Sequence, residues 1–251
     1  MAGHSKWANV KHRKARVDAQ KGKIFTKLAR EIMIAAKEGG GDPDTNFRLR
    51  LAIQKAKEAN VPNDNISRAI QKGLGETESL ALEEVLYEGY ATGGVAVMLD
   101  ILTDNRNRTA SEIRNIFSRN GGSMGETGCV SWLFDRKGYL SIDKKNTKLS
   151  EDDLMLLALE TGAEDFKEED DSYVITTLPE NFEALKEKFL QEKIVLSTAE
   201  VTMVPQTTIV VENPEEAAKV LKLLEALEDH DDVQNVYANF DIPEEIMQSL
   251  I

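Results

Sequence analysis

The spacing of apolar residues changes once along the 251-residue chain, near Gly75, and this change constrains the fold more than any other feature. Before Gly75, apolar side chains recur every three or four residues, as they do on one face of an amphipathic helix. After it, short apolar runs typical of strands alternate with helical segments. The pattern therefore predicts an α+β protein, in which a helical N-terminal domain precedes two α/β domains.

The helical part divides into three short helices. The first runs from Lys23 to the glycines at 39–41, and the second ends before Pro62. The third is predicted to be capped by Asn63 or Asp64. Three such helices, rich in Lys and Arg, are expected to form a small basic bundle.

The order of the later elements predicts how the α/β part is divided. Strands over 95–103 and 129–134 flank a helix over 109–120, which makes one β-α-β unit, and a matching unit spans 207–240. Between these units, residues 139–204 spell β-α-β-β-α-β, the element order of a ferredoxin-like fold. One ferredoxin-like α/β domain is therefore expected inside another.

These patterns also predict the domain boundaries. The basic arm and the three-helix bundle are expected in residues 1–78, and a discontinuous α/β domain in residues 79–136 plus 205–251. The inserted ferredoxin-like α/β domain is expected in residues 137–204.

Charge is distributed unevenly along the chain, whose formal net charge is -13. Residues 1–75 carry 16 Lys and Arg against 7 Asp and Glu, a net of +9, whereas residues 76–251 carry 15 against 37, a net of -22. In residues 1–30, nine basic residues accompany a single acid, Asp18. This asymmetry predicts a polyanion-binding end attached to an acidic body.

The basic N-terminal segment is the strongest candidate for a nucleic-acid interface. Lys and Arg side chains that neutralise phosphates release counterions, which supplies affinity that does not depend on base sequence. Residues 5–21 carry few apolar side chains, so we expect an arm that orders on its target. Trp7 is expected either to stack on an unpaired base or to anchor the arm on the bundle. The predicted nucleic-acid-binding residues are His4, Lys6, Trp7, Lys11, His12, Arg13, Lys14, Arg16, Lys21, Lys23, Lys27, Arg48 and Lys55.

A second candidate interface lies at the third helix. Asn63, Asn65 and Arg68 can read base edges if the second and third helices act as a helix-turn-helix. A helix cap that follows a proline explains the same residues without any function.

A third candidate is the strand-to-helix junction near residue 105. There Arg106 and Arg108 stand beside a helix N-terminus that can hold a phosphate. The alternative is a structural cap, in which Asp104 or Asn107 accepts backbone N–H bonds.

Acidic runs at 168–171 and 228–232 suggest a rival function, a metal-dependent phosphodiesterase that would use Asp229, Asp231 and Asp232. Carboxylates in loops are usually only solvated, and such runs can also attract basic protein surfaces, including ribosomal proteins. We therefore expect no catalytic residue, no metal site and no cofactor.

Other features restrict the class and location of the protein. Cys129 is the only cysteine, so neither an intrachain disulfide nor a cysteine-based zinc cluster is expected. The longest apolar runs, such as 154–159, are far shorter than the roughly 20 residues that cross a bilayer. The N-terminus lacks the apolar segment of a secretory signal. A cytoplasmic protein without membrane contact is predicted, and its oligomeric state stays open.

Several motifs together resemble the YebC family. In chain order they are Gly3-His4-Ser5-Lys6-Trp7, Lys11-His12-Arg13-Lys14, Pro62-Asn63-Asp64-Asn65-Ile66, Tyr87-Glu88-Gly89-Tyr90, Thr103-Asp104-Asn105-Arg106-Asn107-Arg108-Thr109 and Asp231-Asp232-Val233-Gln234-Asn235-Val236-Tyr237. The resemblance covers essentially the whole chain and departs from the family pattern at Thr92, where proline usually precedes the paired glycines. It implies a helical N-terminal domain and two α/β domains, in agreement with the element order.

The resemblance also implies a function without catalysis. The family includes bacterial proteins described as transcriptional regulators and the mitochondrial translational activator of cytochrome c oxidase subunit I. We expect a regulator of gene expression that binds ribosomal RNA or DNA, acting at the ribosome to relieve stalling on stretches such as consecutive prolines. The alternative is a sequence-specific DNA-binding transcriptional regulator, which would show a sequence preference on duplex DNA, whereas a ribosome-bound factor prefers structured RNA.

Overall fold

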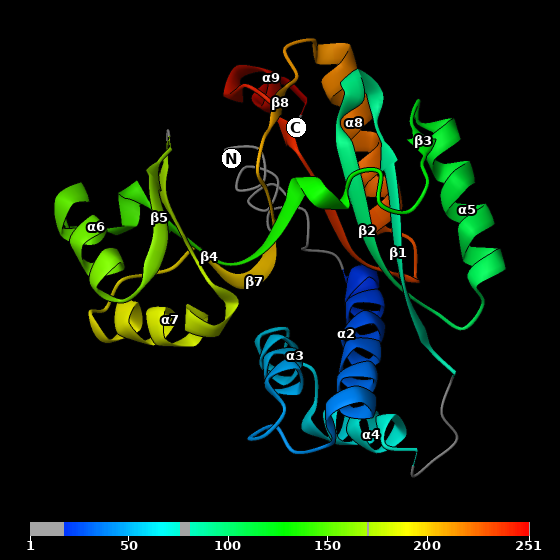
Figure 1. Cartoon of the computed structure of the whole chain (residues 1–251), viewed down its shortest axis with the longest axis horizontal. Helices are drawn as coiled ribbons and strands as arrows, with labels where there is room; N and C mark the ends of the chain where they lie inside the picture. The colour runs from blue at the N-terminus through cyan, green and yellow to red at the C-terminus, as the bar shows by residue number, and fades with distance from the viewer. Residues whose placement is uncertain (1–17, 76–80, 170, 251) are drawn as a thin grey trace.

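The structure, a computed structural model, describes residues 18–75, 81–169 and 171–250, with side chains described from residue 22 onward. Helices come first along the chain, and two sheet-containing units follow (Figure 1). The α+β class with an N-terminal helical region, which the change in hydrophobic period predicted, is confirmed.

The N-terminal helices pack around one long helix, α2 (Asp18–Gly39). α3 (Phe47–Glu58) and α4 (Asn63–Gly73) both pack against its C-terminal half. Their shared core is built from Ile, Leu and Ala side chains spaced at helical intervals, including the fully buried Ile32 and Leu49. In Figure 1, α2 extends downward from the first sheet, with α3 to its left and α4 at its lower end.

The connection from α2 to α3 is fixed by the buried side chain of Asn46. Its Oδ1 accepts the backbone N–H of Leu49 at 3.0 Å, which caps α3. Its Nδ2 donates to the carbonyls of Ala35 and Gly40, each at 2.8 Å. One side chain thus satisfies backbone groups at the end of α2 and the start of α3, where the helices themselves leave them unpaired.

The start of α4 differs from the expectation. The helix begins directly after Pro62, and no side-chain hydrogen bond caps it, so the predicted capping by Asn63 or Asp64 is wrong. The ring of Pro62 holds φ at -58°, which directs the chain into the helix without a capping side chain.

The first sheet is antiparallel throughout. Its strands, in spatial order, are β3 (Ser123–Met124), β1 (Glu83–Tyr90), β2 (Ala96–Thr103) and β9 (Val233–Ala238). α5 (Arg106–Arg119) and α8 (Pro214–Glu228) cover one face, where Val97, Leu99 and Ile101 of β2 meet the apolar stripes of both helices.

Two details of the first sheet correct the prediction from sequence. The segment 129–134 is not a strand but a turn followed by a short 3-10 helix, Ser131–Leu133, because the backbone N–H groups of Gly128, Val130 and Ser131 bond to the carboxylate of Glu88. The strand that pairs with β2 on the side opposite β9 is instead β1, which the hydrophobic pattern did not predict.

The C-terminal β-α-β unit is also shorter than predicted. Only Ile209–Val210 (β8) forms a strand before α8, and it pairs in parallel with β10 (Phe240–Asp241) in a sheet of its own. The final helix, α9 (Glu244–Leu250), packs against α8.

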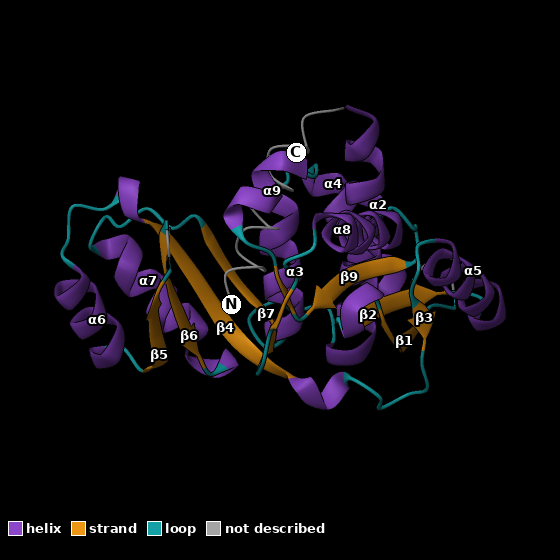
Figure 2. Ribbon diagram, turned by 90° about the horizontal axis from the view of Figure 1, so that it is seen from above, coloured by secondary structure: helices purple, strands orange, loops and turns teal. Residues whose placement is uncertain are grey.

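The second α/β unit falls within the first along the chain. Its elements are β4 (Phe134–Asp143), α6 (Glu151–Glu160), β5 (Ala163–Glu168), β6 (Ser172–Thr177), α7 (Phe182–Gln191) and β7 (Thr198–Pro205). The spatial order β5-β6-β4-β7, antiparallel at every step, is that of a ferredoxin-like sheet. Figure 2 shows this sheet with α6 and α7 at the opposite end of the molecule from α5.

The N-terminal helices contact both α/β units. Leu51 on α3 packs against the core of the second unit, and the N-terminal half of α2 reaches the first unit near the end of α8. None of the described helices has the length and apolar character needed to cross a bilayer.

Candidate nucleic-acid interface

Only part of the predicted interface belongs to the side chains that the structure describes. Those described are Lys23, Lys27, Arg48, Lys55, Arg106 and Arg108. Those outside the described side chains are His4, Lys6, Trp7, Lys11, His12, Arg13, Lys14, Arg16 and Lys21.

Three cations of α2 lie on one face of the helix, at positions 23, 27 and 30, and meet the acidic turn, residues 228–232. Lys23 Nζ donates to the Asp229 carbonyl at 3.1 Å. Lys27 Nζ donates to the Glu228 carbonyl at 2.6 Å. These carbonyls end α8, where helices leave acceptors unpaired and carry a partial negative charge. The predicted interface residues Lys23 and Lys27 therefore bind the protein itself.

The third cation of this face, Arg30, binds Asp232, which lies at the centre of a buried network. Arg30 Nη1 is 2.9 Å from Asp232 Oδ1, while Arg108 Nη2 and Thr109 Oγ1 each lie 2.7 Å from Oδ2. Burial alone raises the pKa of Asp232, but the hydrogen bonds from Thr109, Arg108 and Arg30 outweigh it and hold the pKa below its ordinary value. A single carboxylate thus links α2, α5 and the acidic turn.

The helix that begins near residue 105 has a structural cap. The capping residue is Asn105, and not Asp104 or Asn107 as expected. Asn105 Oδ1 accepts the backbone N–H of Arg108 at 3.1 Å. The Arg108 side chain pairs with Asp104 as well as Asp232, so both of its described partners are carboxylates. Arg106 is exposed, and among the described residues its side chain forms no ion pair.

The two predicted residues of α3 are also engaged. Arg48 pairs with Glu38 of α2 and with Glu84 of β1. Burial lowers the pKa of Arg48, but these two carboxylates outweigh it, so the pKa is raised and the guanidinium stays charged. Lys55 lies 3.6 Å from Glu31 of α2.

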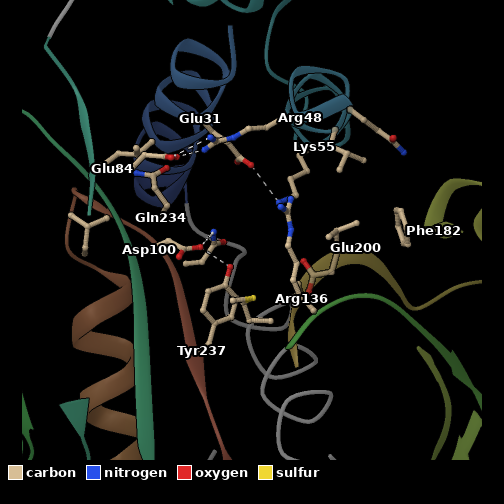
Figure 3. Close-up of a pocket in the computed structure, with 18 of the residues that line it drawn as sticks. Glu31, Arg48, Lys55, Glu84, Asp100, Arg136, Phe182, Glu200, Gln234 and Tyr237 are labelled. Atoms are coloured by element: carbon tan, nitrogen blue, oxygen red, sulfur yellow. Dashed lines mark hydrogen bonds and ion pairs between the residues drawn. The ribbon is translucent and has the colours of Figure 1, made fainter. Parts of the chain in front are cut away.

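A cleft of about 560 Å³ lies where the N-terminal helices and the two sheets meet (Figure 3). Lys55 from α3 and Arg136 from β4 point into it from opposite sides. Five carboxylates and four cations line the cleft, namely Glu31, Glu58, Glu84, Asp100 and Glu200 with Arg48, Lys55, Arg136 and Lys186. Because these charges nearly cancel, the cleft is not the positive groove that a polyanion requires.

Exposed cations without a described ion pair remain on the helical domain. Lys57 of α3 and Arg68 and Lys72 of α4 are exposed, as are the candidate base-reading residues Asn63 and Asn65. Lys57 and Lys72 were not among the predicted interface residues, although their place outside the apolar stripes would have identified them as exposed cations.

The residues proposed for a metal-dependent hydrolase are arranged differently from a metal centre. Asp232 is bonded to two arginines, and Asp229 lies 3.9 Å from Lys23. Over the ranges that the structure describes, no group of three or more His, Cys, Asp or Glu side chains could hold a metal ion.

Arg30 and Asp232 were missed as a functional pair because they are 202 residues apart in sequence. Hydrophobic periodicity gives no information about contacts between positions so distant, and Arg30 and Asp232 each have the sequence surroundings of an ordinary surface charge. Glu88 was missed for a similar reason, since nothing local marks a carboxylate that is 1% exposed.

Comparison with known proteins gives a consistent result over almost the whole chain. A model described as the TACO1/YebC protein N-terminal domain matches residues 5–76, and one described as the TACO1/YebC second and third domain matches residues 82–240. A "Probable transcriptional regulatory protein" of Natranaerobius thermophilus is 60% identical over 250 residues, covering 99% of this chain and 100% of that protein. One with the same name from Pelotomaculum thermopropionicum is 59% identical, covering 96% and 99%.

A solved structure has the same fold. The crystal structure of a conserved hypothetical protein from Aquifex aeolicus, 51% identical in sequence, superposes with a TM-score of 0.80 and covers 94% of this chain and 96% of that one.

Proposed function

Because the chain belongs to the TACO1/YebC family, we propose that it is a nucleic-acid-binding regulator of gene expression, without catalytic activity, that acts at the ribosome and relieves stalled translation. The names of its relatives support a regulatory role.

One observation carries the proposal, the nine cations that accompany one acid in residues 1–30. The last three of them, Lys23, Lys27 and Arg30, hold the acidic turn. Phosphate contacts are therefore assigned to the other six, which are Lys6, Lys11, Arg13, Lys14, Arg16 and Lys21. Six contacts of this kind give an affinity that falls steeply with salt concentration.

The packing of α3 favours a ribosomal target over duplex DNA. In a helix-turn-helix, the first helix lies across the DNA backbone while the second enters the major groove. Here α3, the first of the two helices, contacts the second α/β unit through Leu51 and through Glu58, which lies 3.7 Å from Lys186. These contacts occupy part of the α3 surface that a helix-turn-helix would turn toward the DNA backbone, although Arg50 and Lys57 of α3 stay exposed.

The acidic body supports a second contact. Residues 76–251 carry a net charge of -22, which repels nucleic acid and attracts basic protein surfaces. On a ribosome, RNA and basic proteins lie side by side, so the arm would bind the former and the body the latter.

The decisive experiment compares two targets in one salt series. The protein is sedimented with ribosomes, and its binding to random duplex DNA is followed by fluorescence anisotropy. The test variant is K11Q/R13Q/K14Q/R16Q. The control is K145Q/K148Q/K219Q/K222Q, which removes the same charge from exposed lysines of the two α/β units.

Ribosome association that survives physiological salt, is lost in the arm variant and is kept in the control supports the proposal. Four lost phosphate contacts predict a fall of more than about tenfold in affinity and a shallower salt dependence. Equal loss in both variants, or strong sequence-dependent duplex binding without ribosome association, contradicts it.

A second candidate function, sequence-specific DNA binding, is supported by one observation. Asn63, Asn65 and Arg68 are exposed on α4, and these side-chain types suit adenine and guanine edges. Under this alternative, R68A relaxes base preference at one position and costs about 1–3 kcal/mol of specific binding.

A further inference from the structure

Trp132 is a large aromatic side chain that the fold leaves in solvent. It is 66% exposed, although its neighbours Val130 and Phe134 are 0% and 5% exposed. The chain has only two tryptophans. Exposed tryptophans held in place are typical anchors of protein interfaces.

The loop that carries Trp132 is held rigidly by Glu88. The buried carboxylate accepts the backbone N–H of Gly128 at 2.7 Å, of Val130 at 2.6 Å and of Ser131 at 2.8 Å. Burial raises the pKa of Glu88, but these three bonds outweigh it and leave the pKa lowered, so the carboxylate is an ionised acceptor. Gly128 sits at φ +89°, a conformation that favours glycine.

Tyr90 lies beside Trp132 in this arrangement. Tyr90 Oη and Trp132 Nε1 both donate to the carbonyl of Cys129, each at 3.1 Å. Tyr90 is 38% exposed. The polar edges of the two aromatics therefore converge on one oxygen, which fixes both side chains before any partner arrives.

Two carboxylates act on Cys129, whose carbonyl the two aromatic side chains share. Burial raises the pKa of the Cys129 thiol, and the charged groups that raise it further are the carboxylates of Glu88 and Glu126. Glu126 is exposed and three residues from Cys129, whose N–H donates to the Glu126 carbonyl at 3.2 Å. An aromatic face beside a carboxylate attracts cations and repels phosphates.

We propose that Trp132, Tyr90 and Glu126 form a docking site for a cationic side chain, an arginine above all, of a basic protein partner. A guanidinium can stack on the indole while bonding to the carboxylate. The inference deepens the proposed function, on which it rests for the class of partner, and it assigns the protein contact of the acidic body to a specific place.

The test uses the fluorescence of Trp132 in a W7F background, where it is the only tryptophan. The probes are a (Arg-Gly)6 peptide, a (Lys-Gly)6 peptide and a uridine dodecamer. The arginine peptide is expected to change the emission saturably and the lysine peptide less, because the planar guanidinium stacks better. A change caused by the dodecamer but not by the arginine peptide would overturn the inference in favour of base stacking.

Substitutions of Trp132 separate the contribution of its aromatic ring to peptide binding from that of its apolar surface area. With a labelled arginine peptide, W132L is expected to bind roughly two- to thirtyfold more weakly than the parent, and W132F to retain part of the affinity. E126Q is expected to weaken binding, whereas E180Q, which removes an exposed carboxylate of the second α/β unit, is not. Equal binding by the leucine and phenylalanine variants, or equal effects of E126Q and E180Q, would count against the site.

The same variants distinguish this inference from the proposed function. Ribosome association that needs the arm but not Trp132 would sink the inference and leave the proposed function standing. A specific response of Trp132 to the arginine peptide without any ribosome association would support the docking site and remove the ribosome as its partner.

Discussion

Asp232 shows how one residue can serve the fold while resembling part of an acidic tract. Its side chain is 4% exposed and remains ionised because two arginines and a threonine donate to it. The neighbouring Asp231 is exposed and contributes only its carbonyl to Arg30. Two adjacent aspartates thus have different roles, which the orientation of the chain decides.

We predict that D232N destabilises the protein by about 2–4 kcal/mol in urea denaturation at neutral pH, because Arg30 and Arg108 lose the charge they bind. D231N is the matched control and should change the free energy of unfolding by less than about 0.5 kcal/mol. Comparable effects of the two substitutions would show that the network does not stabilise the fold.

The same network predicts a dependence on pH. The pKa of Asp232 is lower in the folded protein than the ordinary 3.8. Its stabilisation is therefore fully present above pH 3.8 and is lost as pH falls through the lower folded value. The stability difference between wild type and D232N should be constant near neutrality and shrink below about pH 4. A difference that shrinks already between pH 7 and pH 5 would contradict this assignment.

At the scale of elements, the end of α2 and the start of α3 depend on one side chain, Asn46, whose long-range role is not visible in the sequence. Asn46 lies between a proline-containing turn and α3, and it bonds to three backbone groups of two helices. Asn63, at a position that resembles a cap more closely, makes no capping bond.

N46A is expected to lower the free energy of unfolding by about 2–3 kcal/mol, because a cap is lost and two buried carbonyls lose a donor. N63A serves as the control and should cost less than about 0.5 kcal/mol. Thermal or urea unfolding measures both. A loss in N63A as large as that in N46A would mean that Asn63 caps α4 in solution.

The segment 129–134 shows why an element can be predicted wrongly from a sound pattern. Cys129-Val130-Ser131-Trp132-Leu133-Phe134 has the apolar character of a strand, and Val130 and Phe134 are indeed buried. The N–H groups of Val130 and Ser131, however, bond to the Glu88 carboxylate, 42 and 43 residues away, instead of to a neighbouring strand. A pattern of burial predicts which side chains face inward but not which acceptor takes the backbone.

At the scale of the whole molecule, opposite charges of the two ends of the chain meet. Lys23, Lys27 and Arg30 join α2 to the acidic turn, although the sequence places these cations in a segment that favours nucleic acid. Three cations of the segment that the sequence suggested for nucleic-acid binding therefore hold the N-terminal domain against the α/β units instead.

We predict that K23Q/K27Q/R30Q loosens the arrangement of domains and increases the radius of gyration measured by small-angle X-ray scattering. K57Q/R68Q/K72Q removes the same charge from exposed side chains of the same domain and should leave the radius unchanged. High salt should bring the wild type closer to the first variant, because screening weakens exposed pairs such as Lys23 with Asp229. Equal radii for both variants would show that other contacts orient the domain.

The sequence by itself determined the α+β class, the three N-terminal helices, the ferredoxin-like order of the second unit and the division of charge, because each is written in local spacing or in composition. The tertiary structure alone decided which cations remain available and which carboxylates are buried. Arg48, Lys55 and Arg108 resemble binding residues in sequence, yet each meets a carboxylate of another element. An ion pair requires two groups to come within a few ångström, and no pattern along the chain specifies that distance for residues that only folding brings together.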